Sequence, residues 1–377
     1  MSLDIYPVIL IFLILFSSLI SLRLGISVSI IEILTGLIFG NIGILKTEPW
    51  MILIASFGGI LLTFLSGIEI DTQILRKKFK ETFLIGFLSF LTPFTIISLL
   101  MYFIIGWDLL PSLLAGTALS ETSIAIVYSA LVQQNLNNIN LGKILIGATF
   151  ITNLFTAIAL SILFIKPDLS TVIFYIISIF LLFIAYKYSY IIFNSKALKN
   201  KVVEIEIKYI FLLLSIIIFF ANFGKGQAIL PAFLLGLLLS DYFKENATAS
   251  KSKDRIKTVG FAIITPIFFI VGGMNVSIEL IITSLGLFIL IFITRQASKF
   301  LGVYFISNKY FNKNKKYITA MMSTGLTFGL VATVFGLNNG ILDEMTYSIL
   351  TGVLVLSAVL PSLAAEKFFF PHNEDLN

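Results

Sequence analysis

Apolar residues in this chain come in long blocks that are separated by short polar segments. Each block is about 20 residues long, which is the length that crosses a bilayer as a helix. A lipid-exposed segment must satisfy its own backbone hydrogen bonds, so we predict an all-α membrane protein. The pattern predicts thirteen transmembrane helices, at residues 6–23, 26–45, 50–70, 83–105, 109–132, 142–165, 170–193, 207–223, 226–243, 256–275, 278–307, 316–337 and 344–366.

Composition supports this interpretation and excludes several kinds of chemistry. The chain is 58% hydrophobic and 12% charged, with a mean hydropathy of +1.02, whereas a soluble domain carries about 25% charged residues. Cysteine is absent and the only histidine is His372. Thiol chemistry, a multi-histidine metal centre and a Ser-His-Asp triad are therefore excluded. We expect neither an enzyme nor a bound cofactor.

The basic residues predict the orientation in the membrane. Of the lysines and arginines between the predicted spans, 21 fall on one side and only Lys46, Lys166 and Lys225 on the other. The basic-rich side faces the cytoplasm, which predicts an outer N-terminus and a cytoplasmic C-terminus in the cell (inner) membrane. The net charge of +6 is thus a topology signal, and we expect no nucleic-acid partner. Residues 194–206 and 244–258 are predicted to be cytoplasmic loops.

Two predicted spans contain polar runs where the bilayer is deepest. Residues 116–123 read GTALSETS and residues 323–329 read STGLTFG. Such residues allow a helix to unwind so that freed backbone groups hold an ion, or they allow close helix packing. Two runs, seven spans apart, favour inverted repeats.

The predicted organisation is one transmembrane transporter domain over residues 1–377, without a soluble regulatory domain. The first repeat covers about 1–165, the linker helix about 170–193 and the second repeat about 207–366.

Few acidic residues lie within the predicted spans. A charge at the bilayer centre costs at least ~2.5–3.5 kcal/mol, so such residues are candidates for function. Glu121 lies near the centre of a span, Glu32 lies inside the second span, and Glu69 and Asp71 lie at the end of the third. The structural alternatives are a buried hydrogen bond for Glu121, helix packing for Glu32, and capping for Glu69 and Asp71.

Four segments resemble signatures of cation/proton antiporters of the NapA and Kef branch. Residues 31–40 (IEILTGLIFG) resemble "GEILAGILLG", and residues 62–71 (LTFLSGIEID) resemble "LLFLAGLELD". Residues 231–236 (PAFLLG) resemble "AFLAGLLLG", and residues 266–274 (PIFFIVGGM) resemble "PLFFVLVGM". Each segment alone is weakly specific, but the four occur in the family's order along the whole chain.

The resemblance implies a homodimer in membrane lipid that exchanges Na⁺ (or Li⁺ or K⁺) for H⁺ by alternating access. It also implies that two broken helices cross. Here Thr122 and Ser123 would lie on one side of the crossing, and Thr324 to Thr327 on the other. A lysine pairs with the acidic site in this family, and Lys299 fits it. Arg295 lies one turn earlier on the same helix face.

The resemblance breaks down at the residue that matters most for proton coupling. Family members carry "GAxxxDD" or "GAxFxTD" on a helix beside the crossing, whereas residues 147–153 read GATFITN and end in Thr152 and Asn153. Asn153 and Thr122 are expected ligands of the transported cation, but an amide cannot titrate. Either an inactivating substitution mimics a protonated aspartate, or the homologue has moved or lost proton coupling. The alternative function is therefore a transport-inactive or uncoupled protein, such as a sensor or uniporter.

Overall fold

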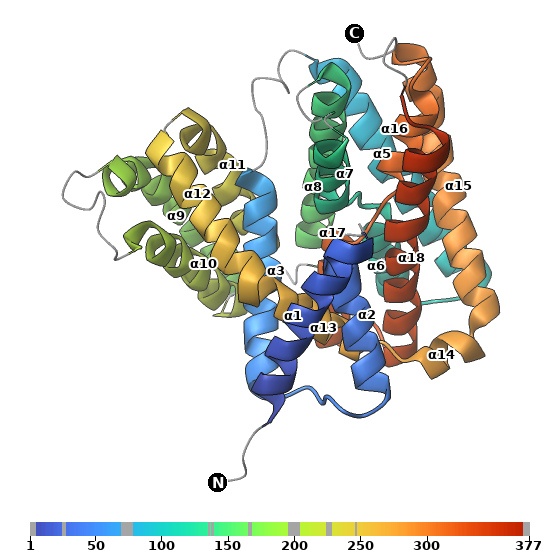
Figure 1. Cartoon of the computed structure of the whole chain (residues 1–377), viewed down its shortest axis with the longest axis horizontal. Helices are drawn as coiled ribbons and strands as arrows, with labels where there is room; N and C mark the ends of the chain where they lie inside the picture. Colours follow the sequence, from blue (N-terminus) through green and yellow to red (C-terminus); the bar gives the residue numbers. More distant parts are fainter. Residues whose placement is uncertain are drawn as a thin grey trace. The chain divides into compact units, whose positions relative to one another are not determined.

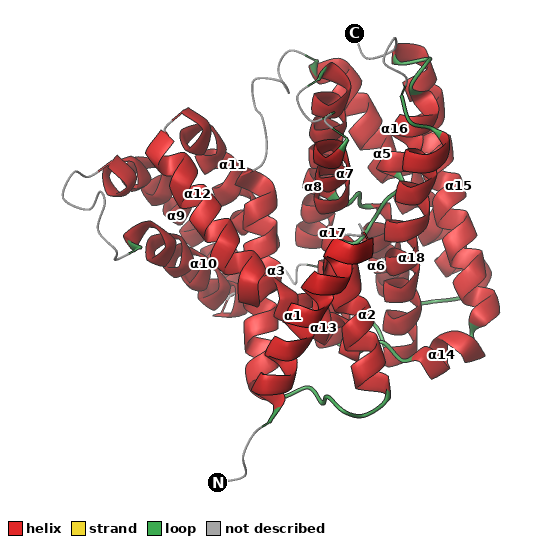
Figure 2. Ribbon diagram, viewed as in Figure 1, coloured by secondary structure: helices red, strands yellow, loops and turns green. Residues whose placement is uncertain are grey.

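The computed structural model describes residues 5–24, 28–68, 78–134, 136, 139–164, 168–194, 204–223, 228–245 and 247–371. Within these residues the regular structure is helical, without a β-strand (Figures 1 and 2). The helices are α1 (Tyr6–Leu24), α2 (Val28–Asn41), α3 (Pro49–Ile68), α5 (Phe79–Leu99), η1 (Leu100–Ile105), α6 (Leu109–Ser120), α7 (Ile124–Gln133), α8 (Asn140–Leu163), α9 (Leu169–Asn194), α10 (Ile205–Phe223), α11 (Ile229–Glu245), α12 (Ala247–Val259), η2 (Gly260–Ile264), α13 (Thr265–Met274), α14 (Ile278–Thr283), α15 (Leu285–Tyr310), α16 (Lys315–Met322), α17 (Thr327–Asn338) and α18 (Glu344–Phe368). The segments η1 and η2 are short π-helical turns that continue their neighbours.

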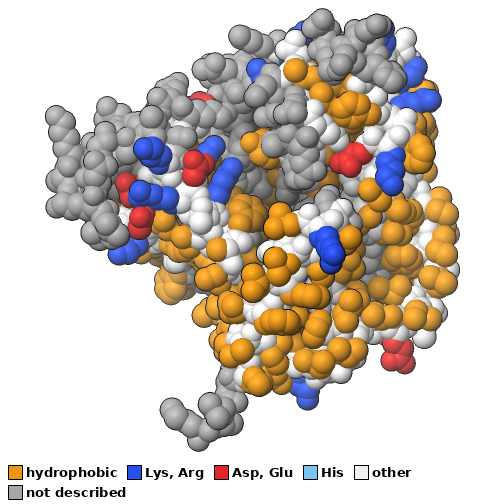
Figure 3. All heavy atoms as spheres, viewed as in Figure 1, with side chains coloured by type: hydrophobic (Ala, Val, Ile, Leu, Met, Phe, Trp, Pro, Cys, Tyr) orange, Lys and Arg blue, Asp and Glu red, His pale blue; other side chains and the backbone are white. Residues whose placement is uncertain are grey.

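The helices account for a protein that spans a membrane many times. Within the described residues, ten helices or runs of successive helices are long and apolar enough to cross a bilayer, and α2, α6 and α11 are shorter apolar helices. One of the ten, Lys315–Asn338, joins α16 to α17. Large apolar side chains such as Phe103, Phe183 and Phe219 are more than half exposed, and apolar side chains dominate the face in Figure 3. Lipid covers such surfaces. The count of thirteen crossings stays a prediction.

The prediction of a loop over residues 244–258 is wrong for most of that segment. Residues 247–259 form α12, which runs through η2 into α13. Alanine, lysine and arginine are favourable helix formers, so a polar sequence can extend a membrane helix. The prediction equated a polar sequence with an irregular one.

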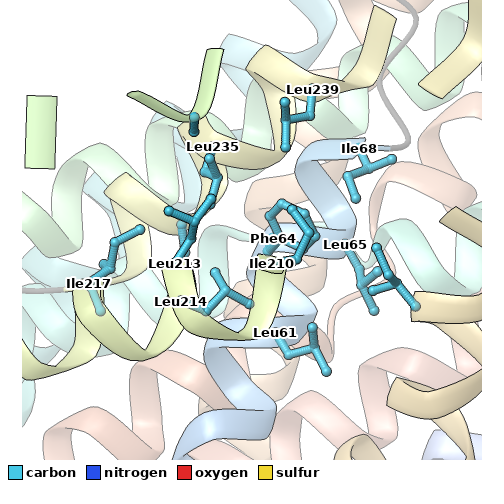
Figure 4. Close-up of a cluster of buried hydrophobic side chains, with 14 of the residues drawn as sticks. Leu61, Phe64, Leu65, Ile68, Ile210, Leu213, Leu214, Ile217, Leu235 and Leu239 are labelled. Carbon is cyan, nitrogen blue, oxygen red and sulfur yellow. The ribbon is translucent and has the colours of Figure 1, made fainter. Parts of the chain in front are cut away.

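The chain forms two compact units. One consists of residues 52–72 and 157–268. In this unit α9, α10, α11 and α12 pack on one another. Its core joins residues of α3 and α10, including Phe64, Leu65 and Leu214 (Figure 4).

The other unit consists of residues 1–51, 73–156 and 269–377. Here α5 packs against both α6 and α15, and α17 packs against α6 and α18. This unit draws on both ends of the chain, so its boundaries do not follow the predicted repeats, and the repeat assignment stays a prediction.

The four segments that carry the family resemblance pack in two pairs, one in each unit. A Cβ at Gly36 would collide with the Ile270 backbone, and one at Gly273 would collide with the Ile33 backbone, so residues 31–40 cross residues 266–274. Likewise, Gly67 and Gly236 face each other at the crossing of α3 and α11. Small residues allow such close approach of membrane helices, which explains why these motifs contain glycine.

Candidate functional site

The first predicted break lies between α6 and α7. Residues 121–123 do not continue either helix, and Glu121 has extended dihedral angles of φ −65° and ψ 163°. Just before the break, the Ser120 hydroxyl donates to the Thr117 carbonyl over 2.9 Å. Such side-chain bonds to the backbone compete with regular helix formation. The break leaves the last carbonyls of α6 and the first N–H groups of α7 available to other partners.

The second break lies between α16 and α17, at residues 323–326. It is built in the same way. The Ser323 hydroxyl donates to the Thr319 carbonyl over 2.7 Å, and the Thr324 hydroxyl donates to the Met321 carbonyl over 2.8 Å. Both hydroxyls therefore bind carbonyls of the last turn of α16.

The two breaks meet, which confirms the prediction of two broken, crossing helices. The Thr122 hydroxyl donates to the Met322 carbonyl over 2.9 Å. The Ser123 backbone N–H donates to the Thr324 carbonyl over 3.4 Å. Residues about 200 positions apart in the sequence thus exchange hydrogen bonds between the unwound segments.

The unwound stretches are shorter than the polar runs that predicted them. Gly116 and Gly329 stay inside α6 and α17. A Cβ at Gly116 would lie 2.7 Å from the Phe94 carbonyl, and one at Gly329 would lie 2.7 Å from the Ala118 carbonyl. These two glycines therefore allow close helix packing, which was the alternative explanation of the runs.

Lys299 is held at the crossing by three oxygen atoms. Its ammonium donates to the Ser120 carbonyl over 2.6 Å, and to the Ser89 and Thr122 hydroxyls over 2.9 Å each. The residue is 0% exposed, so it does not reach toward the membrane surface. An ammonium has three donors, and all three have acceptors here. We call Lys299 and these three oxygen atoms the paired cluster.

Arg295, one turn earlier on α15, joins the two breaks. Its guanidinium donates to the Ser323 carbonyl over 2.6 Å through Nη1 and to the Glu121 carbonyl over 3.3 Å through Nη2. Both carbonyls lie at helix C-termini, where a positive charge is favourable. Gly325 provides the space, since a Cβ there would collide with Nη2 and lie 3.3 Å from Glu121 Oε1.

Three side chains at the breaks carry oxygens without a hydrogen-bond partner among the described residues. They are Glu121, with both carboxylate oxygens, and Ser123 and Thr327, with their hydroxyls. We call these three side chains the unpaired cluster. The carboxylate points toward the N–H groups of Leu326 and Gly329 without reaching hydrogen-bond geometry with either. A buried polar group without a partner costs about 1–3 kcal/mol. Such a concentration at one place indicates a binding site.

The predicted ion-binding positions on α8 lie beside this crossing. The Thr152 hydroxyl donates to the Gly86 carbonyl over 3.1 Å and to the Ala148 carbonyl over 3.0 Å. Its capacity is thus used in joining α8 to α5. Asn153 is 0% exposed, and neither the nitrogen nor the oxygen of its amide has a partner in the described part of the chain.

The position of Thr149, one helical turn before Asn153, indicates that this face of α8 is directed toward the second break. The Thr149 hydroxyl lies 3.7 Å from the Met322 sulfur, and the Met322 carbonyl accepts from Thr122. Residues 149 and 153 share one face of α8. Lys299 and Thr122 are in direct contact over 2.9 Å, and the closeness of both to Asn153 stays a prediction.

The remaining candidates lie elsewhere. Glu32 is 2% exposed on α2, where its backbone carbonyl accepts from the Thr35 hydroxyl, and none of the polar contacts described above involves it. Glu69 and Asp71 lie outside the described residues.

Sequence reasoning missed Ser89, one of the three partners of Lys299. Ser89 is one of five hydroxyl side chains in α5, with Thr82, Thr92, Thr95 and Ser98, so the sequence alone does not single it out.

The fold and this site define a class of protein, a multi-pass membrane transporter with two broken helices that meet. The family model described as "Sodium/hydrogen exchanger, transmembrane" matches residues 8–367. The chain therefore belongs to the sodium/hydrogen exchanger family.

Individual relatives agree with this assignment. The chain is 26% identical to "Probable Na(+)/H(+) antiporter 3" of Methanocaldococcus jannaschii, over 89% of each chain. It is 24% identical to "Na(+)/H(+) antiporter" of Enterococcus hirae, over 93% of each. Its fold is similar to that of the sodium proton antiporter MjNhaP1 from Methanocaldococcus jannaschii at pH 8. The TM-score is 0.73 at 17% identity, covering 98% of this chain and 100% of that one.

Proposed function

We propose that this protein exchanges Na⁺ for H⁺ across the cell membrane by alternating access. The observation that carries the proposal is the meeting of two unwound segments around a buried carboxylate without hydrogen-bond partners. Discontinuous helices of this kind bind ions at the midplane of secondary transporters. The antiporter names of the relatives suggest which ions are exchanged, and Li⁺ and K⁺ are further candidates.

The transport cycle requires a defined orientation. The basic-rich connections support an inner-membrane protein whose N-terminus lies outside the cell and whose C-terminus lies in the cytoplasm. A reporter that is active only in the cytoplasm, fused after Asn377, should then be active. We further propose a homodimer, as the family resemblance implies, and native mass spectrometry in lipid would test it.

Asn153 favours a second candidate function. An amide can offer one carbonyl oxygen to a cation but cannot exchange it for a proton. A protein that relied on residue 153 alone would conduct cations without proton coupling, or would bind them without transport. Its fully buried amide without partners supports this alternative.

Proteoliposomes can separate the two functions. The purified chain would be reconstituted with a pH-sensitive dye inside, and Na⁺, Li⁺ or K⁺ would be added outside. Exchange predicts cation-dependent alkalinisation of the lumen, which empty liposomes do not show. A uniporter would take up radioactive sodium without a pH change. If the wild type is inactive and Asn153→Asp transports, then residue 153 is the missing coupling group.

A further inference from the structure

We propose that Glu121 is the group at which this protein exchanges its cation for a proton, with Ser123 and Thr327 as further ligands of the cation. This inference rests on the proposed function and names the site within it. In this chain the exchanging carboxylate would thus lie in the first break rather than on α8, where Asn153 stands.

The first argument is the location of the unsatisfied oxygens. Glu121 and Ser123 are 0% exposed and Thr327 is 3% exposed, yet neither carboxylate oxygen nor either hydroxyl has a partner among the described residues. Glu121 and Ser123 lie in the first break, and Thr327 begins α17 directly after the second. The backbone N–H groups of Leu326 and Gly329, near Thr327, act on the Glu121 carboxylate. Carboxylate and hydroxyl oxygens are the ligands that hard cations prefer.

The second argument concerns the two cations nearby. Arg295 and Lys299 are the charged groups that act on Glu121, and both come from α15. Arg295 donates to backbone carbonyls through Nη1 and Nη2, Lys299 donates to a carbonyl and two hydroxyls, and none of these bonds goes to the carboxylate. Arg295 Nε has no partner among the described residues. The carboxylate is therefore attracted to positive charge but is not bound by it. Its lone pairs remain available to a proton or a cation.

The third argument is chemical balance. Protonated Glu121 binds Na⁺ by releasing its proton, and on the other side of the membrane it takes up a proton by releasing Na⁺. One O–H bond is exchanged for one Na⁺ contact, and the charge of the site is the same in both states. Asn153 can contribute its carbonyl oxygen to the cation but has no proton to release.

The test compares Glu121→Gln with a matched control. Glu32→Gln removes the carboxylate of another buried glutamate, on α2. The variants and the wild type would be assayed as full-length protein in proteoliposomes for Na⁺-driven proton flux. In parallel, the thermal midpoint would be measured in detergent with NaCl or with choline chloride, at several pH values. We expect Glu121→Gln to lower the flux at least tenfold and to abolish the Na⁺-dependent shift of the midpoint. Glu32→Gln should retain both within about twofold.

A double variant tests the assignment of roles. Adding Asn153→Asp to Glu121→Gln supplies a new titratable group beside the same crossing, and it should restore part of the flux. Full flux in Glu121→Gln would overturn the inference and leave the proposed function intact. A wild type that is stabilised by Na⁺ through Glu121 but shows no flux would overturn the proposed function and retain the site. A wild type with neither response would overturn both.

Discussion

The crossing contains two groups of buried polar side chains, which differ in whether their polar atoms have hydrogen-bond partners. In the paired cluster, Lys299 donates to three oxygen atoms, and each of these contacts is 2.9 Å or shorter. In the unpaired cluster, Glu121, Ser123 and Thr327 have no partner for their side-chain oxygens. Lys299 and Ser89 come from α15 and α5, whereas the other members of both groups come from the broken helices. All of these side chains are at most 3% exposed, so burial does not explain the difference.

The difference indicates a division of labour. A fully satisfied buried network makes a structure rigid, so the paired cluster fixes the ends of the broken helices. The bonds of Arg295 Nη1 and Nη2 to the Ser323 and Glu121 carbonyls add to this. A group of unsatisfied oxygens is costly unless a ligand completes it. The unpaired cluster is then the part that the transported ion occupies. The predictions below test whether these roles can be separated, beginning with the largest expected effect.

Lys299→Met should destabilise the protein most. The substitution keeps most of the apolar stem but removes the ammonium from the Ser120 carbonyl and from both hydroxyls. Ser89 then retains only its 3.4 Å contact with the Thr122 hydroxyl. At about 1–3 kcal/mol for each orphaned group, we expect a loss of about 2–4 kcal/mol, measured as a lower thermal midpoint in Na⁺-free detergent. Glu121→Gln should change the free energy of unfolding by less than about 1 kcal/mol, since it removes no hydrogen bond. Equal losses in the two variants would contradict the division.

Gly325→Ala should have an intermediate effect on stability. The new methyl group would collide with the Arg295 guanidinium and displace it from the carbonyls at the ends of both broken helices. We expect a loss of about 1–2 kcal/mol from these charged hydrogen bonds, together with slower transport. Gly286→Ala is the matched control, because a Cβ there has open space within 4 Å. If both variants behave like the wild type, Arg295 does not hold the breaks together.

Thr327→Val should weaken cation binding and leave stability nearly unchanged. Valine keeps the shape of threonine and removes a hydroxyl that has no partner in the structure. We expect the apparent affinity for Na⁺ to fall about three- to tenfold, which corresponds to one lost ligand of about 1 kcal/mol. Ser89→Ala in the paired cluster should show the opposite balance, with a lower thermal midpoint and a smaller change in affinity.

Much of this arrangement follows from the sequence, for identifiable reasons. Long apolar blocks predict membrane helices because the bilayer dictates their length. The polar runs around Glu121 and Thr324 predict the two breaks because such residues are otherwise rare at that depth. Lys299 could be assigned to the crossing from the family resemblance, and its contact with Thr122 is present over 2.9 Å.

Other features depend on packing that a single sequence does not reveal. The sequence does not distinguish Gly325, which makes room for a guanidinium, from Gly116, which allows two helices to approach. It also does not indicate that Thr152 is engaged with backbone carbonyls while its neighbour Asn153 has no partner. Which polar groups are satisfied is decided by contacts between distant segments. This is why the unpaired cluster emerges only in three dimensions.

The smallest expected effect concerns the membrane potential, to which transport by the wild type should be indifferent. If the exchanging site is Glu121 alone, each full cycle carries one proton in one direction and one Na⁺ in the other, so the net charge moved is zero. A K⁺ gradient with valinomycin would impose a potential, and we expect the rate of Na⁺–H⁺ exchange to change less than twofold, since moving one net charge through 100 mV is worth about 2.3 kcal/mol. Asn153→Asp supplies a second carboxylate that can bring an additional proton into the cycle, so exchange by that variant should become sensitive to the potential. A wild type that already responds strongly would mean that a second group, with Lys299 the nearest candidate, carries a proton as well. The paired cluster would then take part in coupling, and the separation of scaffold from ion site would fail.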